Sequence, residues 1–207
     1  KNNLKDGYLR PIIFKGVGSM APESENCKTY LAIAGWKWNS LYKNKNGISL
    51  CTSTWKKPHE TVFPVKAKSS GSYQIATLAK NYALSAGYDD ALLLDLKNNI
   101  AEGTACNIFW RIKDKIYTPK THSILNGITR RIVISILKKL NIPIIVGDFP
   151  ANHLINSSEV FFTGTAAEII GIKSLDSHLF NSVEITDLLK KEYNKLKENN
   201  EISLNSS

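Results

Sequence analysis

The chain has 207 residues, of which 43% are hydrophobic and 22% are charged; this suits one good-sized domain, or one domain plus part of another, and excludes a wholly disordered chain. It carries 27 Lys and Arg against 18 Asp and Glu, for a formal charge of +9, and residues 1–68 hold 12 of these cations but only 4 of the anions. No apolar run reaches the roughly 20 residues of a membrane-spanning helix, so we expect no membrane partner.

Hydrophobic periodicity and turn residues predict strands mixed with helices. In chain order we expect strands at 8–14, 29–38 and 48–55, a helix at 73–86, a strand at 91–96, a hairpin of 107–112 and 115–118, a helix at 128–140, a strand at 144–149, a short helical segment at 151–156, a strand at 159–163 and a helix at 183–197. Because strands and helices do not alternate strictly, we expect an α+β fold with a largely antiparallel or barrel-like sheet.

The uneven charge raises the hypothesis of a basic module that binds nucleic acid. Only four of the 27 cations are arginine, and the lysines of the first third are dispersed along the chain. Proteins that recognise nucleic acids usually cluster arginine and interleave aromatic residues. We therefore favour solvated surface lysines and expect no nucleic-acid partner.

The cysteines and histidines indicate neither a disulfide framework nor a metal site. Cys27, Cys51 and Cys106 are odd in number and lack CxxC spacing, and the four histidines are scattered without ligand spacing. A reducing, cytoplasmic compartment fits this pattern best.

Two segments contain candidate catalytic groups. Lys68, in KAKSSGSY, precedes a predicted helix and is followed by small residues, so a planar ligand could approach it closely and react with its amine as a Schiff base. Glu102, in IAEGTACNIF, could hold a protonated heteroaromatic nitrogen, as a pyridoxal cofactor requires. The ordinary alternatives are a surface lysine before a helix and a glutamate in a turn.

Two further segments are typical of anion sites. Leu125–Thr129 (LNGIT) is a glycine-containing helix entry, where free N–H groups and the helix dipole favour phosphate. Thr163–Glu168 (TGTAAE) follows an apolar strand and offers hydroxyls and exposed N–H donors. An ordinary helix start and a tight turn are the alternatives. Together the four segments contain the parts that a pyridoxal 5'-phosphate site requires.

With YLRPIIF, GWKWNSL, GYDDALLLD and EVFFTGTAAEI, these motifs resemble the branched-chain amino-acid aminotransferases, within the class IV (fold type IV) pyridoxal-phosphate enzymes. The resemblance runs from about Gly7 to about Asp176. It implies that Lys68 is the catalytic residue, which binds the cofactor as a Schiff base and shuttles the substrate proton. Lys66 is a nearby alternative, but Lys68 keeps the family's spacing to Tyr73.

The resemblance also implies roles for other residues. Besides Lys68, those implied to bind the cofactor are Tyr73 at its phenolic oxygen, Glu102 at its pyridine nitrogen, Leu125 against its ring, and Ile128, Thr129 and Thr165 around its phosphate. Those implied to bind the substrate are Tyr8, Arg10 and Trp38 in the pocket wall, and Thr165 and Ala166 at the carboxylate.

The implied reaction is transamination of leucine, isoleucine and valine with 2-oxoglutarate, in a homodimer or larger homo-oligomer whose partners are amino acids and 2-oxo acids. D-amino-acid aminotransferases and aminodeoxychorismate lyases share the fold, but YLRP and GTAAEI favour the branched-chain type. A truncated, non-catalytic remnant is a further alternative.

The family's architecture implies a domain division. We expect the end of a small N-terminal domain at 1–35, a linker at 36–47 and the large cofactor domain at 48–207. The family's small domain supplies an arginine to the cofactor phosphate, and this sequence has no counterpart for it. Ser72 stands where the family usually has asparagine before the motif tyrosine.

Overall fold

The computed structural model describes residues 3–4, 7–38, 40–44 and 46–199. The chain divides into two compact units, Lys1–Leu41 and Tyr42–Ser207. This division falls within 36–47, the range predicted as a linker, of which residues 39 and 45 lie outside the described residues. The predicted domains themselves, which include the undescribed residues 1–2, 5–6 and 200–207, stay predictions.

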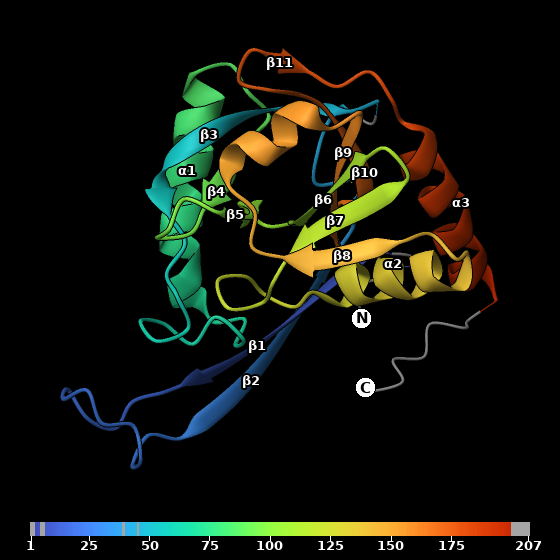
Figure 1. Ribbon diagram of the computed structural model, residues 1–207. Coiled ribbons are helices and arrows are strands. Elements are labelled where there is room, and N and C mark those ends of the chain that lie inside the picture. Colours follow the sequence, from blue (N-terminus) through green and yellow to red (C-terminus); the bar gives the residue numbers. More distant parts are fainter. Residues whose placement is uncertain (1–2, 5–6, 39, 45, 200–207) are drawn as a thin grey trace. The chain divides into compact units, whose positions relative to one another are not determined.

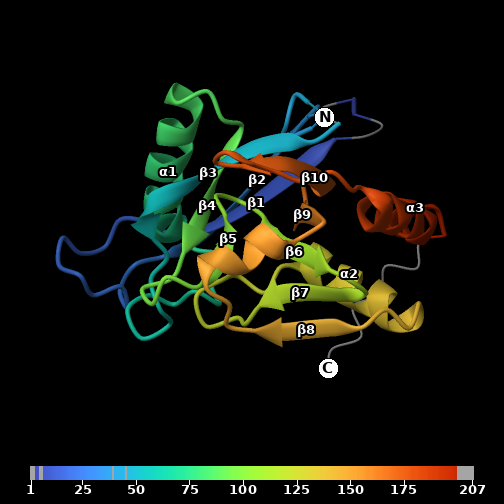
Figure 2. The ribbon, with the colours of Figure 1, turned by 45° about the horizontal axis from the view of Figure 1, so that its top comes forward.

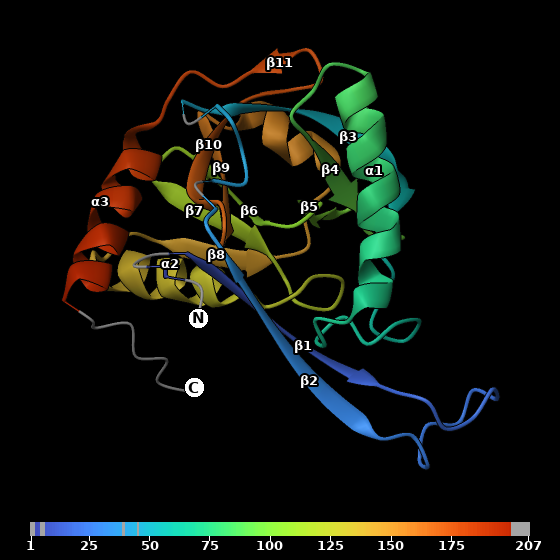
Figure 3. The ribbon, with the colours of Figure 1, turned by 180° about the vertical axis from the view of Figure 1, so that it is seen from behind.

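The first unit is an antiparallel ribbon of two strands, β1 (Tyr8–Lys15) and β2 (Thr29–Trp36), drawn in blue in Figure 3. Tyr8 lies opposite Trp36 at one end and Lys15 opposite Thr29 at the other. Each strand has a free edge within this two-stranded sheet. Pro11 is tolerated in β1 for that reason, because an edge strand does not need every N–H as a donor.

The second unit is built on a closed barrel of six strands (Figure 1). In barrel order these are β3 (Ile48–Lys56), β4 (Asp90–Leu94), β5 (Ile100–Gly103), β6 (Asn107–Ile112), β9 (Glu159–Gly164) and β10 (Glu168–Leu175). β10 pairs with β9 and β3 and so closes the ring; β3 pairs in parallel with both β10 and β4, and the other barrel pairs are antiparallel. The predicted α+β fold with a barrel-like large domain is confirmed.

Three short strands extend the sheet beyond the barrel. β7 (Lys115–Pro119) forms a hairpin with β6, and β8 (Ile144–Gly147) lies parallel to β7, as Figure 2 shows. β11 (His178–Leu179) pairs with the end of β10.

The helices cover opposite sides of the barrel (Figure 1). α1 (Tyr73–Ser85), preceded by a 3-10 turn at Ser70–Ser72, packs Ala79 and Ala83 against β3 and β4, because alanine lets a helix approach a sheet closely. On the other side, α2 (Ile128–Lys139) and α3 (Glu184–Glu198) share a core with the sheet. A second 3-10 segment spans Ala151–Asn156, and no helix in the described part of the chain is long and apolar enough to cross a membrane.

The structure corrects several predicted boundaries. β5 and β10 are strands that the sequence pattern did not predict, because β5 is only four residues long and contains Glu102, and Gly171 interrupts the apolar run of β10. The strand predicted at 91–96 ends at Leu94, because the Asp95 carboxylate accepts hydrogen bonds from the N–H groups of the following turn. The strands predicted at 29–38 and 144–149 likewise end two residues early.

Candidate active site

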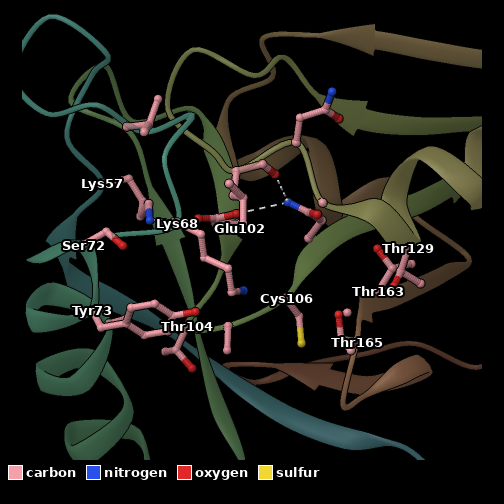
Figure 4. Close-up of a pocket in the computed structure, with 18 of the residues that line it drawn as sticks. Lys57, Lys68, Ser72, Tyr73, Glu102, Thr104, Cys106, Thr129, Thr163 and Thr165 are labelled. Carbon is pink, nitrogen blue, oxygen red and sulfur yellow. Dashed lines mark hydrogen bonds and ion pairs between the residues drawn. The ribbon is translucent and has the colours of Figure 1, made fainter. Parts of the chain in front are cut away.

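One cavity of about 300 Å³ lies in the second unit, where the strand ends of the barrel meet the first turns of α1 and α2 (Figure 4). Its volume is at the lower end of the range for small-molecule sites. The residues predicted to bind the cofactor all line it, namely Lys68, Tyr73, Glu102, Leu125, Ile128, Thr129 and Thr165. These residues come from segments far apart in the sequence, so the fold brings the candidate groups together.

Glu102 lies on β5 and is only 8% exposed. Its Oε1 forms an ion pair with Lys57 Nζ at 2.8 Å, and its Oε2 accepts a hydrogen bond from Asn107 Nδ2 at 3.0 Å. Burial raises the pKa of Glu102 above its ordinary value, and the Lys57 ammonium is the largest influence in the opposite direction. The carboxylate is therefore held by both oxygens at the cavity wall.

Asn107 connects Glu102 to the next wall of the cavity. The same Nδ2 that donates to Glu102 also donates to the carbonyl of Leu125 at 2.8 Å, and Figure 4 shows both bonds as dashed lines. Leu125 precedes Gly127, the N-cap residue of α2. A single amide thus fixes the carboxylate relative to the entry of α2.

Lys68 and Lys66 differ in where their amines lie. Lys68 lines the cavity, and its Nζ lies 5.9 Å from the ring centroid of Tyr73. Lys66 pairs with Glu60 at 3.0 Å, and its side chain is 75% exposed and away from the lining. The geometry therefore favours Lys68 over Lys66 as the amine of the site.

The opposite wall offers hydrogen-bond donors suited to an anion. Thr129, Thr163 and Thr165 lie together there, across the cavity from Lys68 (Figure 4). Gly127 gives α2 no side-chain cap, and the first N–H groups of a helix have no partner within it. The Thr163 hydroxyl is buried in this wall without a hydrogen-bond partner among the described residues.

Arg130 does not line the cavity. Its guanidinium is buried and donates to the carbonyl of Pro119 at 2.8 Å and to Asn126 Oδ1 at 2.9 Å. Burial lowers the pKa of Arg130 to about 10. This arginine anchors the loop before α2 rather than facing a ligand.

The residues predicted to bind the substrate lie mostly in the first unit. Tyr8 and Arg10 are on β1 and Trp38 follows β2; the Tyr8 and Trp38 rings meet edge-on at 4.8 Å, and the Arg10 guanidinium lies 5.7 Å from the Tyr8 ring centroid. Ala166 lies in the turn between β9 and β10, next to Thr165 and outside the cavity lining. Their assignment to a substrate pocket stays a prediction.

Sequence reasoning missed Lys57 and Asn107 as parts of the site, whereas Thr163 belongs to the predicted TGTAAE segment. Lys57 follows Lys56 in a polar stretch and looks like a surface residue, yet it is only 8% exposed. No residue near Lys57 in the sequence indicates that it pairs with Glu102, which is distant along the chain. Asn107 stands in the NIF of a predicted strand, where an asparagine among apolar residues was the one available signal. No group of three or more His, Cys, Asp or Glu in the described residues could hold a metal ion.

The fold agrees with what comparison to known proteins finds. The family model described as amino-transferase class IV matches residues 1–175. The chain belongs to the class IV aminotransferase family, and the resemblance to its branched-chain members is confirmed.

Individual relatives give the same result. The chain is 39% identical over 202 residues to a probable branched-chain-amino-acid aminotransferase of Rickettsia felis, an alignment that covers 95% of this chain and 69% of the relative. The branched-chain aminotransferase structure from Thermoproteus uzoniensis with norvaline matches with a TM-score of 0.90 at 30% identity, covering 94% of this chain and 66% of that one. The holo-form of the branched-chain enzyme from Thermobaculum terrenum matches with a TM-score of 0.85 at 30% identity, covering 92% and 64%. The chain thus spans about two thirds of the length of these relatives.

Proposed function

We propose that this chain is the cofactor-binding part of a pyridoxal-phosphate-dependent aminotransferase that acts on leucine, isoleucine and valine with 2-oxoglutarate. The observation that carries the proposal is one cavity that holds the Lys68 amine, the buried Glu102 carboxylate and the uncapped start of α2. A further branched-chain aminotransferase structure, 33% identical to this chain, is complexed with N-(5'-phosphopyridoxyl)-L-glutamate, which supports glutamate and 2-oxoglutarate as the second pair of substrates.

The residues present fit this cofactor. An amine, a carboxylate and a tyrosine lie on one side of the cavity, and threonines with a helix N-terminus lie on the other. The buried Thr163 hydroxyl without a partner among the described residues also fits a polar ligand, because buried polar atoms in proteins are nearly always satisfied. Lys68 would hold the aldehyde carbon, Tyr73 the phenolic oxygen, Glu102 the ring nitrogen, and the N–H groups of Ile128 and Thr129 the phosphate.

Pyridoxal phosphate, when bound, supplies an electron sink for the negative charge that develops at the substrate Cα. Glu102 keeps a proton on the ring nitrogen through its ionised carboxylate, and Asn107 orients that carboxylate. The N–H groups at the start of α2 bind the phosphate and resist its displacement. Once the substrate amine has replaced it at the aldehyde carbon, Lys68 Nζ, which lies 5.9 Å from the Tyr73 ring centroid, would take the proton from the substrate Cα and return it at that aldehyde carbon.

Lys68→Ala tests the proposal, with Lys66→Ala as the matched control. Protein loaded with pyridoxal phosphate, reduced with borohydride and digested should carry the cofactor mass on the peptide containing Lys68. Lys68→Ala should lose that mass and lower the amino-transfer rate from leucine by at least roughly a hundredfold, the usual contribution of a general acid–base group. Lys66→Ala should keep both, because its amine lies outside the cavity. Cofactor mass on another lysine, with Lys68→Ala still active, would refute the assignment.

The same preparation distinguishes the alternatives. Amino transfer from L-leucine, L-isoleucine and L-valine supports the branched-chain activity, transfer from D-alanine supports a D-amino-acid aminotransferase, and release of pyruvate from aminodeoxychorismate supports the lyase. Cofactor binding without any transfer identifies a non-catalytic remnant. We also expect self-association and a cytoplasmic location, which size measurements and cell fractionation test.

A further inference from the structure

The cavity contains two lysines whose amines have different surroundings. Lys57 Nζ lies 2.8 Å from Glu102 Oε1, and the side chains of both residues are only 10% exposed. Lys68 Nζ has no hydrogen bond or ion pair to any described residue and faces the Tyr73 ring. The structure therefore separates one lysine that is bound to a carboxylate from another that is open to a ligand.

Lys57 is held in place by the backbone as well as by its ion pair. It follows β3 directly, and its N–H donates to the carbonyl of Leu94, the last residue of β4, at 2.8 Å. A buried ammonium is costly unless it is paired, and the pair with Glu102 offsets the burial of Lys57. An amine that is bound to a carboxylate is not placed to attack a carbonyl, which leaves that chemistry to Lys68.

Other titratable groups also act on Glu102. Lys68, before α1, opposes the rise of its pKa, and the charge of Glu102 in turn influences Arg130 on α2 and Cys106 in the β5–β6 turn. Lys57 is the cation in direct contact with the carboxylate, since Arg130 donates to Pro119 and Asn126 instead. The charge state of Glu102 should therefore depend on Lys57 more than on any of the others.

We propose that Lys57 is a positioning residue that keeps the Glu102 carboxylate ionised and oriented, so that a proton shared with a bound pyridine ring resides on the ring nitrogen. This inference rests on the proposed function. The Lys57 ammonium is in direct contact with the Glu102 carboxylate. A ring nitrogen that bonds to Glu102 would lie no closer to the ammonium than the carboxylate does. The ammonium consequently stabilises the arrangement with a negative carboxylate and a positive nitrogen over the neutral arrangement. Asn107 and Lys57 take one oxygen each, which fixes the plane of the carboxylate.

The first experiment uses the cofactor-free protein. The carboxyl carbon of Glu102 is followed by ¹³C NMR through a pH titration, in the wild type and in Lys57→Met, Lys57→Gln and Lys57→Arg. We expect a higher pKa for Glu102 in the Met and Gln variants and a value near the wild type in the Arg variant. Lys56→Met is the matched control, because Lys56 donates to Asn98 at 2.8 Å and not to the cavity. If Lys57→Met does not fold, Lys57→Gln decides, since it removes the charge but keeps a polar hydrogen-bond donor.

The second experiment adds pyridoxal phosphate labelled with ¹⁵N in the ring. The wild type and Lys57→Arg should show the chemical shift of a protonated pyridine nitrogen. Lys57→Met and Lys57→Gln should move toward the unprotonated shift and bind the cofactor roughly tenfold to a hundredfold more weakly, as expected for a lost charge-assisted contact. A purely structural role of Lys57 would lower stability without moving this shift.

The outcomes separate the two proposals. An unchanged Glu102 titration, or an unchanged ¹⁵N shift in cofactor-bound Lys57→Gln, overturns the role of Lys57 and leaves the proposed function intact. A wild type that binds no pyridoxal phosphate overturns the proposed function and the ring-nitrogen part of this inference together. In that case a Glu102 titration that still responds to Lys57 would show that the pair tunes the carboxylate for another ligand.

Discussion

Gly127, the N-cap residue of α2, has no room for a side chain. A Cβ added there would overlap Asn107 Oδ1, and the Asn107 side chain is buried and held in place. Gly127 itself has φ −60° and ψ 148°, a conformation open to any residue, so backbone strain is not the obstacle. Gly127→Ala therefore tests mainly the packing between Gly127 and Asn107.

The cost follows from what Asn107 would lose on moving away. Its Nδ2 donates to the Glu102 carboxylate at 3.0 Å and to the Leu125 carbonyl at 2.8 Å. A hydrogen bond to a charged group contributes about 1.5–3 kcal/mol and a neutral one about 0.5–1.5 kcal/mol. Replacing glycine by alanine also weakens the cap and stiffens the unfolded chain, effects of opposite sign and similar size. We expect Gly127→Ala to lower the free energy of unfolding by about 2–4 kcal/mol.

Urea unfolding in two backgrounds measures this cost. In the wild type, Gly127→Ala should lower the free energy of unfolding by the full amount. It should also weaken cofactor binding, because Glu102 loses its orientation. In an Asn107→Ala background the obstructing side chain is gone, and Gly127→Ala should cost less than about 1 kcal/mol. Equal costs in the two backgrounds would refute the reasoning, since the loss would then come from Gly127 itself.

Two further predictions concern stability. Glu159→Ala should lower the free energy of unfolding by about 3–5 kcal/mol in urea, because the buried carboxylate accepts bonds from the N–H groups of Ile185 and Thr186 at the start of α3; a loss below about 1 kcal/mol would contradict this. Burial and the charge of Asp90 raise the pKa of Cys106 to about 12 from 9.0. The folded thiol thus keeps a proton that the unfolded thiol releases. Above about pH 9 the free energy of unfolding of the wild type should therefore fall by about 1.4 kcal/mol per pH unit relative to that of Cys106→Ala. Parallel curves of unfolding free energy against pH for the two proteins, between about pH 8 and 11, would contradict this prediction.

The sequence was sufficient to predict the elements with strong local signals. α2 is amphipathic over its whole length and begins where LNGIT predicts, and the turn of the β6–β7 hairpin is formed by Lys113 in the left-handed region, at φ 55°. β5 and β10 were missed although each pairs with the strand before it in the chain, because Gly171 interrupts the apolar run of β10 and β5 is too short. A four-residue strand that contains a buried glutamate has no period to read.

The candidate site could be predicted only as far as its residues stand in recognisable motifs. Lys68, Glu102 and the LNGIT segment each carry such a local signal. Lys57 and Asn107 act through contacts that form after β3, β5 and β6 come together, and a sequence pattern does not contain those contacts.

The contacts around Asn107 link the two ends of the proposed cofactor site. At one end Asn107 holds Glu102, the expected partner of the ring nitrogen; at the other it holds Leu125 and packs against Gly127, where the expected phosphate site begins. Pyridoxal phosphate has a rigid ring whose nitrogen and phosphate are separated by a short CH2–O linker and the ring itself, so a site binds it more tightly when both walls are held at a matching separation before binding. One buried amide that bonds to both walls provides this pre-organisation. A change at Asn107 should therefore weaken phosphate binding as well as ring-nitrogen binding, even though its side chain is expected to touch only the wall between them.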